Sequence, residues 1–419
     1  MILSDIAEYV TEKVNSDKIT LNQYVTTDSL LQNKRGRQTA QNLPSMPCVL
    51  TSYSQGDILI SNIRPYLKKI WFADSNGGCS TDVLVFRAKK GHSSNFLFAL
   101  LMQDAFFSYM MQGSKGSKMP RGDKNQIMHY KVPTFSSFEE ENIGNIIVNI
   151  ERKIALNRQI NDNLEAMAKQ LYDYWFVQFD FPDENGKPYK SNGGKMVWNE
   201  CMKKSIPADW KTSLLSEWID YSLERVSTSV VSDGDYYTPI EVIPRNKMSL
   251  STTLPVENAV SGLCRYKKKD ILLSNRRVYF HKICLAPFDG LTRDTVMVLR
   301  PKHEENLGYI YETMFSDSFI SYATKVSYGS LQPVLSWTEA QKYHVLTPAK
   351  NLSEKYGKLI NGIIEKVLSS QMEIIQLTKQ RDELLPLLMN GQATVNYHLK
   401  ALPFYRSCQN VSERSPHIL

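Results

Sequence analysis

Hydrophobic positions in the first third of the chain follow the short, broken pattern of β-strands. Residues 57–61, 69–72 and 82–87 are short β-rich runs separated by Gly, Pro and Asn residues, and residues 95–111 have helical spacing. Short apolar runs between turn-forming residues are typical of strands joined by tight connections. The pattern therefore predicts a globular α+β region.

A longer hydrophobic period begins after this region. Its positions follow alternating steps of four and three, which places them along one seam of a helix wound against a partner helix. They are Ile143, Ile147, Ile150, Ile154, Asn157, Asn161, Leu164, Ala168, Leu171 and Trp175. A helix over residues 139–176 would be about 57 Å long at 1.5 Å per residue.

The whole arrangement occurs twice. Residues 57–66 read DILISNIRPY and residues 270–279 read DILLSNRRVY, an offset of 213 positions. Adding 213 to the seam gives Tyr356, Ile360, Ile363, Val367, Ser370, Ile374, Leu377, Arg381, Leu384 and Leu388. A solenoid is excluded because its repeats would be about 20–50 residues long. The sequence therefore predicts a duplicated globular domain, each copy followed by a long helix.

Polar residues interrupt the seam at two positions. Asn157 and Asn161 are candidates for fixing how the two helices meet, because buried polar residues in such seams specify register. Alternatively, these positions face solvent on an irregular helix. The predicted contacts between the helices are Ile147, Ile150, Ile154, Asn157, Asn161, Leu164, Ile360, Ile363, Val367, Ile374, Leu377 and Leu384.

Local signals place the domain boundaries. Ser137-x-x-Glu140 and Asn351-x-x-Glu354 resemble helix-starting capping boxes, Pro386 should kink or end the second helix, and Gly391 can cap it. We predict a first globular domain at 1–135, a first helix at 136–178, a crossover linker at 179–205, a second globular domain at 206–349, a second helix at 350–391 and a mobile tail at 392–419. The aromatic residues of 172–181 are expected to form a hydrophobic plug at the end of the first helix.

Composition and motifs narrow the class of function. The six cysteines form no CxxC pair and the seven histidines show no HxxxH spacing, which argues against a metal site. The sequence has no GxxxxGK[ST] or GxGxxG loop and no Asn/Asp-Pro-Pro-aromatic tetrapeptide. We expect a non-catalytic protein without a cofactor. The acidic N-terminal stretch and the short apolar run 96–102 predict a cytoplasmic protein with no membrane span.

Basic charge gathers around both copies of the repeat. The net charge is +7, residues 265–277 hold six basic residues against one acid, and residues 64–69 hold three basic residues and no acid. This distribution favours nucleic acid as a partner. A non-catalytic coiled-coil scaffold whose globular halves bind proteins is the alternative, but it does not explain the basic clusters.

The centre and the end of the chain resemble a known family. The segments are NRQINDNLEAMAKQLYDYWFVQFDFP at 157–182, GKPYKSNGGKMVWNE at 186–200, IPADW at 206–210 and LLPLLMNGQ at 384–392. Together with the duplicated arrangement they make the chain similar, over about residues 3–391, to the DNA-specificity (S) subunit of type I restriction-modification enzymes.

This resemblance implies a fold and a set of partners. It implies two target recognition domains that each read one half of a split, asymmetric site in double-stranded DNA. The two helices would lie antiparallel as a coiled-coil spacer, with pseudo-twofold symmetry. Two methyltransferase subunits, and restriction subunits in the full complex, would carry out adenine methylation and cutting.

Candidate DNA-binding residues follow from the chemistry of groove recognition, in which Arg, Lys, Asn and Gln read base edges and Lys or Ser hold phosphates. They are Asn62, Arg64, Lys68, Lys69, Lys118, Arg121, Lys268, Asn275, Arg276, Arg277, Lys282, Arg293, Ser330 and Gln332. The alternative for Asn62 and Asn275 is that they are turn residues after a buried strand. The loops 117–124 and 330–336 are the better candidates for base-specific contacts, because they occupy matching places yet differ in chemistry.

Overall fold

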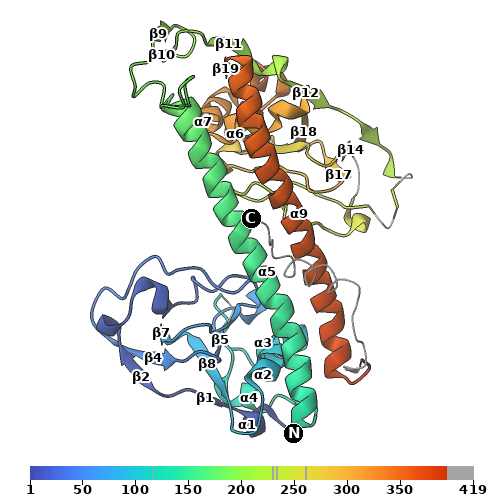
Figure 1. The fold of residues 1–419 in the computed structure, drawn as a ribbon. Coiled ribbons are helices and arrows are strands. Elements are labelled where there is room, and N and C mark those ends of the chain that lie inside the picture. Colours follow the sequence, from blue (N-terminus) through green and yellow to red (C-terminus); the bar gives the residue numbers. More distant parts are fainter. Residues whose placement is uncertain (117, 229–230, 233–234, 260–261, 394–419) are drawn as a thin grey trace, which may run out of the picture. The chain divides into compact units, whose positions relative to one another are not determined.

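The computed structural model describes residues 1–116, 118–228, 231–232, 235–259 and 262–393, which form two compact units (Figure 1). Unit 1 comprises Met1–Arg152 together with the part of the chain that follows Leu377, and unit 2 comprises Lys153–Leu377. Most of the predicted tail, 394–419, lies outside the described residues. Within the described ranges, no helix is both long and apolar enough to cross a membrane.

Unit 1 contains two small sheets and a group of helices. One sheet has the strand order β1-β8-β5-β6 and the other has the order β2-β4-β7-β3. The strands are β1 Ala7–Tyr9, β2 Lys13–Asn15, β3 Tyr24–Val25, β4 Val49–Tyr53, β5 Ile58–Ser61, β6 Ile70–Phe72, β7 Gly77–Cys79 and β8 Val83–Ala88. The helices are α1 Leu3–Ile6, α2 Ser94–Leu101, α3 Asp104–Gln112, α4 Lys124–Met128 and the start of α5, Ser137–Tyr172. The single helical patch expected at 95–111 is therefore two helices.

Alternation along β5 explains how the layers of unit 1 pack. Ile58 and Ile60 point into the core formed with α1, α2, α3 and the start of α5. Leu59 points the other way, into the core under the second sheet. Successive strand residues face opposite sides of a sheet, so a fully apolar strand such as β5 must be covered on both faces.

Unit 2 repeats this plan. Its sheets have the orders β12-β18-β15-β16 and β13-β14-β17, with two further pairs, β9-β10 and β11-β19. The strands are β9 Met196–Asn199, β10 Lys204–Pro207, β11 Lys211–Leu214, β12 Ile219–Ser222, β13 Arg225–Val226, β14 Leu263–Tyr266, β15 Ile271–Ser274, β16 Ile283–Leu285, β17 Gly290–Arg293, β18 Val296–Pro301 and β19 His344–Thr347. The helices are α6 Leu307–Phe315, α7 Asp317–Val326, α8 Trp337–Ala340, the end of α5 and most of α9, Lys350–Met389.

The two copies share strand register as well as order. Ile58 is opposite Phe86 in unit 1, and Ile271 is opposite Leu299 in unit 2, which is the same pair displaced by 213. The α+β class predicted from the sequence is confirmed in both units.

An ion pair between a buried aspartate and a partly exposed arginine also recurs at the same offset. Arg87 donates two hydrogen bonds of 2.8 Å to the carboxylate of Asp57, and Arg300 donates bonds of 2.7 and 2.6 Å to that of Asp270. Both aspartates are buried, and a backbone N–H from the preceding turn adds a further bond to each, at 2.7 Å. The pair ties the start of the apolar strand to the end of its neighbour.

The boundary between the units falls inside both long helices. In unit 1, Arg381 of α9 is buried and donates a 2.5 Å hydrogen bond to Glu151 of α5. In unit 2, Asn157 of α5 donates a 2.7 Å bond to Glu373 of α9, and Tyr172 lies against Tyr356. Within unit 2 the two helical segments therefore run in opposite directions.

The predicted seam is largely interior. Asn157 is 7% exposed and Asn161 is 4% exposed, so the solvent-facing alternative does not describe them. The apolar residues divide into a buried set, Ile147, Ile154, Ile360, Val367 and Ile374, and a partly buried set, Ile150, Leu164, Ile363, Leu377 and Leu384. Several of them pack into the globular cores: Ile147 belongs to that of unit 1, and Ile360 and Val367 belong to that of unit 2.

The helix ends differ in part from the sequence prediction. Ser136 and Glu139 form the capping box of α5, one residue earlier than predicted, because the side chain of Glu140 instead accepts hydrogen bonds from His92 and Ser93. Asn351 lies inside the first turn of α9 and is not its cap. Helix α9 also continues past Pro386 to Met389. Gly391 has a φ of +74°, the left-handed conformation predicted for a cap at this position.

The aromatic plug is present in unit 2. A π-helical turn, Asp173–Val177, follows α5, and Phe176 packs against Trp210, Tyr309 and Tyr356 with ring centroids 4.6–5.6 Å apart. Phe179 and Phe181 are also buried. The predicted linker 179–205 is therefore partly ordered: it contains β9 and the start of β10.

We expect Arg300→Ala to lower the free energy of unfolding by about 3 kcal/mol, because the buried Asp270 carboxylate would lose its charged partner. Urea denaturation of the full chain would measure the change. Lys342→Ala is the control, because Lys342 forms an exposed pair with Glu339. This variant should lower the free energy of unfolding by less than about 1 kcal/mol. Equal denaturation midpoints for the two variants would contradict the structural role of the pair.

Candidate nucleic-acid interface

The candidate site begins at a turn that follows the central apolar strand in each unit. In unit 1 the Ser61 hydroxyl donates a 2.9 Å hydrogen bond to the carbonyl of Ile63, and Arg64 has a φ of +52°. The same bond joins Ser274 to Arg276 at 2.9 Å in unit 2, where Arg277 has a φ of +49°. A left-handed conformation is uncommon outside glycine, so its occurrence at both arginines indicates a backbone requirement.

Each turn holds a short hairpin through backbone hydrogen bonds. We call residues 115–121 the first hairpin and residues 328–334 the second hairpin. The first hairpin is held by bonds from Arg64 N–H to Pro120 O at 2.8 Å and from Gly122 N–H to Asn62 O at 3.2 Å.

The second hairpin is held in the same way. Arg277 N–H donates to Pro333 O at 2.8 Å, and Leu335 N–H donates to Asn275 O at 2.8 Å. All four residues lie 213 positions beyond their counterparts. The two loops predicted to make base-specific contacts, 117–124 and 330–336, are therefore held in place by the repeated turn.

The hairpin tips differ in chemistry although their backbones match. Glycines with a φ of +94° and +97°, Gly116 and Gly329, open the two tips. The first tip presents Lys118 and Met119, and its Ser117 lies outside the described residues. The second tip presents Ser330, Leu331 and Gln332, all exposed, and Leu331 is 88% exposed. A loop that is held by a rigid scaffold and carries variable residues at its tip is the arrangement expected of a recognition element.

Two of the predicted DNA contacts have a structural partner. The ammonium of Lys69 donates to the carbonyl of Thr27, and that of Lys282 donates to the carbonyl of Ile240 at 2.7 Å. Thr27 and Ile240 are themselves 213 positions apart. Burial lowers the pKa of both lysines. Both lysines therefore hold a neighbouring loop through a backbone oxygen, and their contact with DNA stays a prediction.

Other predicted residues are engaged in salt bridges at the surface. Lys68 lies 2.8 Å from Asp104, Arg121 lies 3.1 Å from Asp82, and Lys268 lies 3.4 Å from Glu365. All three cations keep a third or more of their side-chain surface exposed. Such pairs contribute little stability and exchange readily for a phosphate.

The remaining predicted residues surround the two turns. Arg64 and Arg276 are exposed. Arg277 donates a 3.4 Å hydrogen bond to Leu331 O in the second hairpin. Arg293 is half-buried at the end of β17, and its Nε atom has no hydrogen-bond partner in the described part of the chain.

The two asparagines of the turns are placed as structural residues. Asn62 is buried, and its backbone N–H donates to Asp82 O at 2.8 Å. The side-chain amide of Asn275 donates to Asp294 O at 2.8 Å. The structure thus favours the alternative in which these residues fix the turn.

Two exposed tyrosines were missed by the sequence analysis. Tyr66 is 51% exposed and Tyr279 is 48% exposed, and they occupy equivalent positions one turn beyond Arg64 and Arg277. The signal was available, because both copies of the repeat end in tyrosine. It was not used because the candidate contacts were chosen among Arg, Lys, Asn, Gln and Ser residues.

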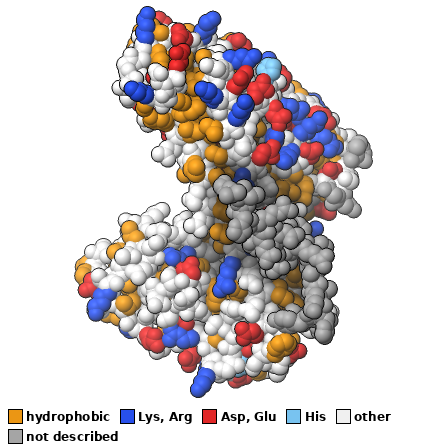
Figure 2. Space-filling model, in the orientation of Figure 1, with side chains coloured by type: hydrophobic (Ala, Val, Ile, Leu, Met, Phe, Trp, Pro, Cys, Tyr) orange, Lys and Arg blue, Asp and Glu red, His pale blue; other side chains and the backbone are white. Residues whose placement is uncertain are grey.

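Charge around these elements is mixed. On the face shown in Figure 2, basic and acidic side chains lie next to one another on each unit. The basic clusters noted in the sequence therefore do not form one continuous positive surface on this face.

The class of protein follows from comparison with known families. Residues 5–166 match the family described as the type I restriction modification DNA specificity domain. This range includes the first turn, the first hairpin and most of α5. The predicted resemblance is confirmed by this match, and the chain is similar to type I restriction-modification specificity subunits.

Particular relatives extend the similarity beyond that range. The chain is 23% identical over 385 residues to the Type I restriction enzyme MjaIX specificity subunit of Methanocaldococcus jannaschii, covering 86% of this chain and 83% of the relative. It is also 23% identical over 457 residues to the Type I restriction enzyme HindI specificity subunit of Haemophilus influenzae, covering 93% of this chain and 98% of the relative.

A solved structure supports the fold. The S subunit of a type I restriction-modification system from M. genitalium superimposes with a TM-score of 0.54 over 93% of this chain and 95% of that chain. The sequence identity is 14%, so this likeness concerns the fold alone.

We expect Lys282→Met to lower the free energy of unfolding by about 1 kcal/mol, because the carbonyl of Ile240 would lose its partly buried donor. Lys69→Met should act in the same way on unit 1. Lys325→Met, on the exposed side of α7, is the control. It should change the free energy of unfolding by no more than about 0.5 kcal/mol. Hydrogen exchange around residues 238–242 would locate the effect; unchanged protection there would refute the assigned role.

Proposed function

We propose that the chain is the DNA sequence-recognition subunit of a type I restriction-modification complex, and that it reads an asymmetric site in two separate parts. One part would be read by each unit. The observation that carries this proposal is the recurrence of the same turn and hairpin in both units with different residues at the tips. The same turn and hairpin with different residues at the tip suit a protein that reads two different short DNA sequences.

The division of labour follows the boundaries given above. Residues 1–135 and 206–349 would be target recognition domains, and residues 136–178 and 350–391 would be spacer helices joined through the linker 179–205. We propose that the helices form an antiparallel coiled-coil spacer with pseudo-twofold symmetry. A rod of about 57 Å spans roughly 17 base pairs at 3.4 Å each, which is an outer limit for the separation of the half-sites.

The hairpin tips are the proposed base-reading elements. Lys118 and Arg121 would act in the first hairpin, and Ser330 and Gln332 would act in the second. Arginine and lysine pair with guanine and glutamine pairs with adenine in the major groove. The two tips therefore favour different bases, which suits an asymmetric site.

A second group of residues would hold the DNA backbone. Arg64, Arg276 and Lys268 are exposed enough to reach phosphates, and Tyr66 and Tyr279 could contact sugars beside them. Lys68, Arg277 and Arg293 are further candidates for contacts with the DNA. Contacts of this kind position a protein on the duplex without reading its sequence.

The catalytic work is assigned to other chains. The relatives are specificity subunits of restriction enzymes, and we propose that this chain likewise positions two methyltransferase subunits, together with restriction subunits in the full complex. The chain itself would need no cofactor or metal.

Co-expression with the cognate methyltransferase subunit, followed by genome-wide mapping of methylated adenines, tests the proposal. We expect a motif of two short parts separated by a fixed number of unspecified bases. Gln332→Ala should weaken the base preference in one part of the motif, and Arg121→Ala should weaken it in the other part. Each good base contact provides about 1–3 kcal/mol of discrimination between bases. Lys187→Ala, in the linker, is the control and should leave the motif unchanged.

A contiguous motif, or no motif, would reject the two-part reader. An unaltered motif in both hairpin variants would reject the assignment of the tips while leaving the two-part reader in place.

The salt dependence of DNA binding separates this function from the scaffold alternative. Binding should weaken steeply as salt rises, because neutralised phosphates release counterions. Arg276→Ala and Lys268→Ala should each weaken binding to all sequences about equally and reduce the slope of log K against log salt by about 1. Salt-independent retention, or none, would favour a scaffold whose globular halves bind proteins.

A further inference from the structure

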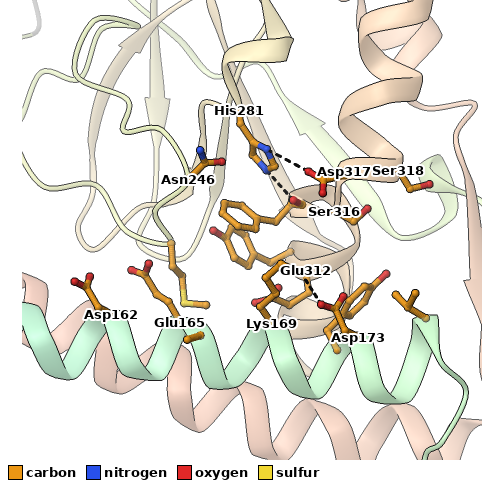
Figure 3. A pocket seen from close by; sticks show the side chains of 16 residues that line it. Asp162, Glu165, Lys169, Asp173, Asn246, His281, Glu312, Ser316, Asp317 and Ser318 are labelled. Carbon is orange, nitrogen blue, oxygen red and sulfur yellow. Dashed lines mark hydrogen bonds and ion pairs between the residues drawn. The ribbon is translucent and has the colours of Figure 1, made fainter. Parts of the chain in front are cut away.

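Unit 2 contains a cavity of about 520 Å³ that the proposed DNA contacts do not use (Figure 3). It lies between the last turns of α5 and the junction of α6 with α7, and His281 and Asn246 lie on the far side from α5. Every lining residue belongs to unit 2, so the cavity is complete within one compact unit.

Five carboxyl groups line this cavity. They are Asp162, Glu165, Asp173, Glu312 and Asp317. Lys169 lies 2.6 Å from Asp173, and Lys247 lies 2.5 Å from Asp162 and 3.9 Å from Glu165, so five acids face two lysines. A phosphate or any other anion is therefore a poor occupant.

Glu312 is the most informative of these acids. The residue is only 3% exposed, and its carboxyl group has no hydrogen bond or salt bridge to the residues that the structure describes. Buried polar groups in native proteins nearly always have a partner, and the charge of Lys169 only partly offsets the burial of this carboxyl group. A cationic group entering the cavity would supply the missing partner.

The fold itself does not require this acid. Helices α2 and α6 are equivalent, and the position that matches Glu312 in unit 1 is Ala99, which is fully buried. On the long helices, the positions that match Glu165 and Asp162 by the 213-residue offset are Thr378 and Ile375. Asp162, Glu165 and Glu312 thus belong to the second copy alone, whereas Asp317 has an acidic counterpart in the first copy, Asp104.

The remaining walls are apolar and aromatic. Tyr172, Met248, Tyr311 and Phe315 line the cavity between the acids, and the buried hydroxyl of Tyr311 has no hydrogen-bond partner among the described residues. Methylene groups pack well against such walls, and aromatic faces attract cations. A bare metal ion would gain little there, and in the described chain no three His, Cys, Asp or Glu residues cluster in a way that could hold one.

We propose that this cavity binds an alkyl ammonium group, with a free linear diamine as its ligand. One ammonium would pair with Glu312 and Glu165 at the inner end, and the methylene chain would lie against Tyr311 and Phe315. The second ammonium would lie near Asp317, whose carboxylate is 96% exposed at the mouth.

The ionisation of the two inner acids supports the proposal. Burial raises the pKa of Glu165 to about 7 and that of Glu312 to about 8, so both are largely protonated in slightly acidic solution. An ammonium pairs with the charged form, so its affinity should rise as pH increases from 6 to 9. The other titratable groups that face these acids are Asp162, Lys169, Tyr172, Asp173, Lys247, His281, Tyr311, Asp317 and Tyr356.

The test is isothermal titration calorimetry of the full chain with 1,4-diaminobutane, without DNA. A second arm uses N-acetyl-lysine amide, which distinguishes a lysine side chain of a partner protein from a free diamine. The variants are Glu312→Gln, which keeps the shape of the side chain, and Glu312→Ala, which restores the residue found in the first copy. Glu383→Gln on α9 removes the same charge outside the cavity and is the control.

We expect the diamine to bind, with an affinity at least about tenfold higher at pH 9 than at pH 6. Both Glu312 variants should lose about tenfold or more in affinity at pH 9, the usual loss when a charged hydrogen-bond partner is removed. Glu383→Gln should bind as the wild type does. Binding of the lysine derivative alone would keep the alkyl ammonium site and assign it to a partner protein.

Absence of binding in both arms, or equal affinity in wild type and both Glu312 variants, would overturn the proposal. Because DNA is absent from the experiment, such a result would leave the proposed DNA recognition untouched.

Discussion

The backbone hydrogen bonds between the turn and the hairpin are the constraint on which the candidate interface depends. Arg64 and Arg277 adopt a left-handed conformation, and their N–H groups donate to Pro120 and Pro333. Each turn is fixed in its own place by the end of a fully buried strand. The position of each hairpin is therefore set by the core of its unit and not by the residues at its tip.

This separation explains how the two copies can differ without losing their fold. The contacts that recur at the 213-residue offset are backbone hydrogen bonds, an Asp–Arg pair and a lysine bound to a loop carbonyl. None of them involves a tip side chain. Substitutions at Lys118 or Leu331 change the exposed chemistry and leave those contacts in place.

The sequence was sufficient for the features that repeat. The offset of 213, the two long helices and the apolar strands follow from periodicity, which a duplicated core preserves. Finer features were missed for physical reasons. The capping box was placed one residue late because Glu140 bonds to His92, a contact between residues far apart in the chain.

Charge was the least predictable property of the candidate site. Lys69 and Lys282 look like surface cations in the sequence, and only the three-dimensional position of Thr27 and Ile240 shows that they point inward. The acidic cavity was missed for the same reason, since Glu165 and Glu312 come together from distant segments. Composition reports how many charges a chain has but not which of them face each other.

The way the long helices are shared has a consequence for synthesis on the ribosome. The core of unit 1 includes Leu385, Leu388 and Met389, which are translated long after residue 152 has emerged. Unit 2 lies entirely between these two segments of the sequence and can fold before them. The apolar surface around Ile143 and Ile147 stays uncovered until the end of α9 has been translated. The nascent first unit therefore carries an uncovered hydrophobic face during most of translation, a state in which chains are prone to aggregate and depend on chaperones.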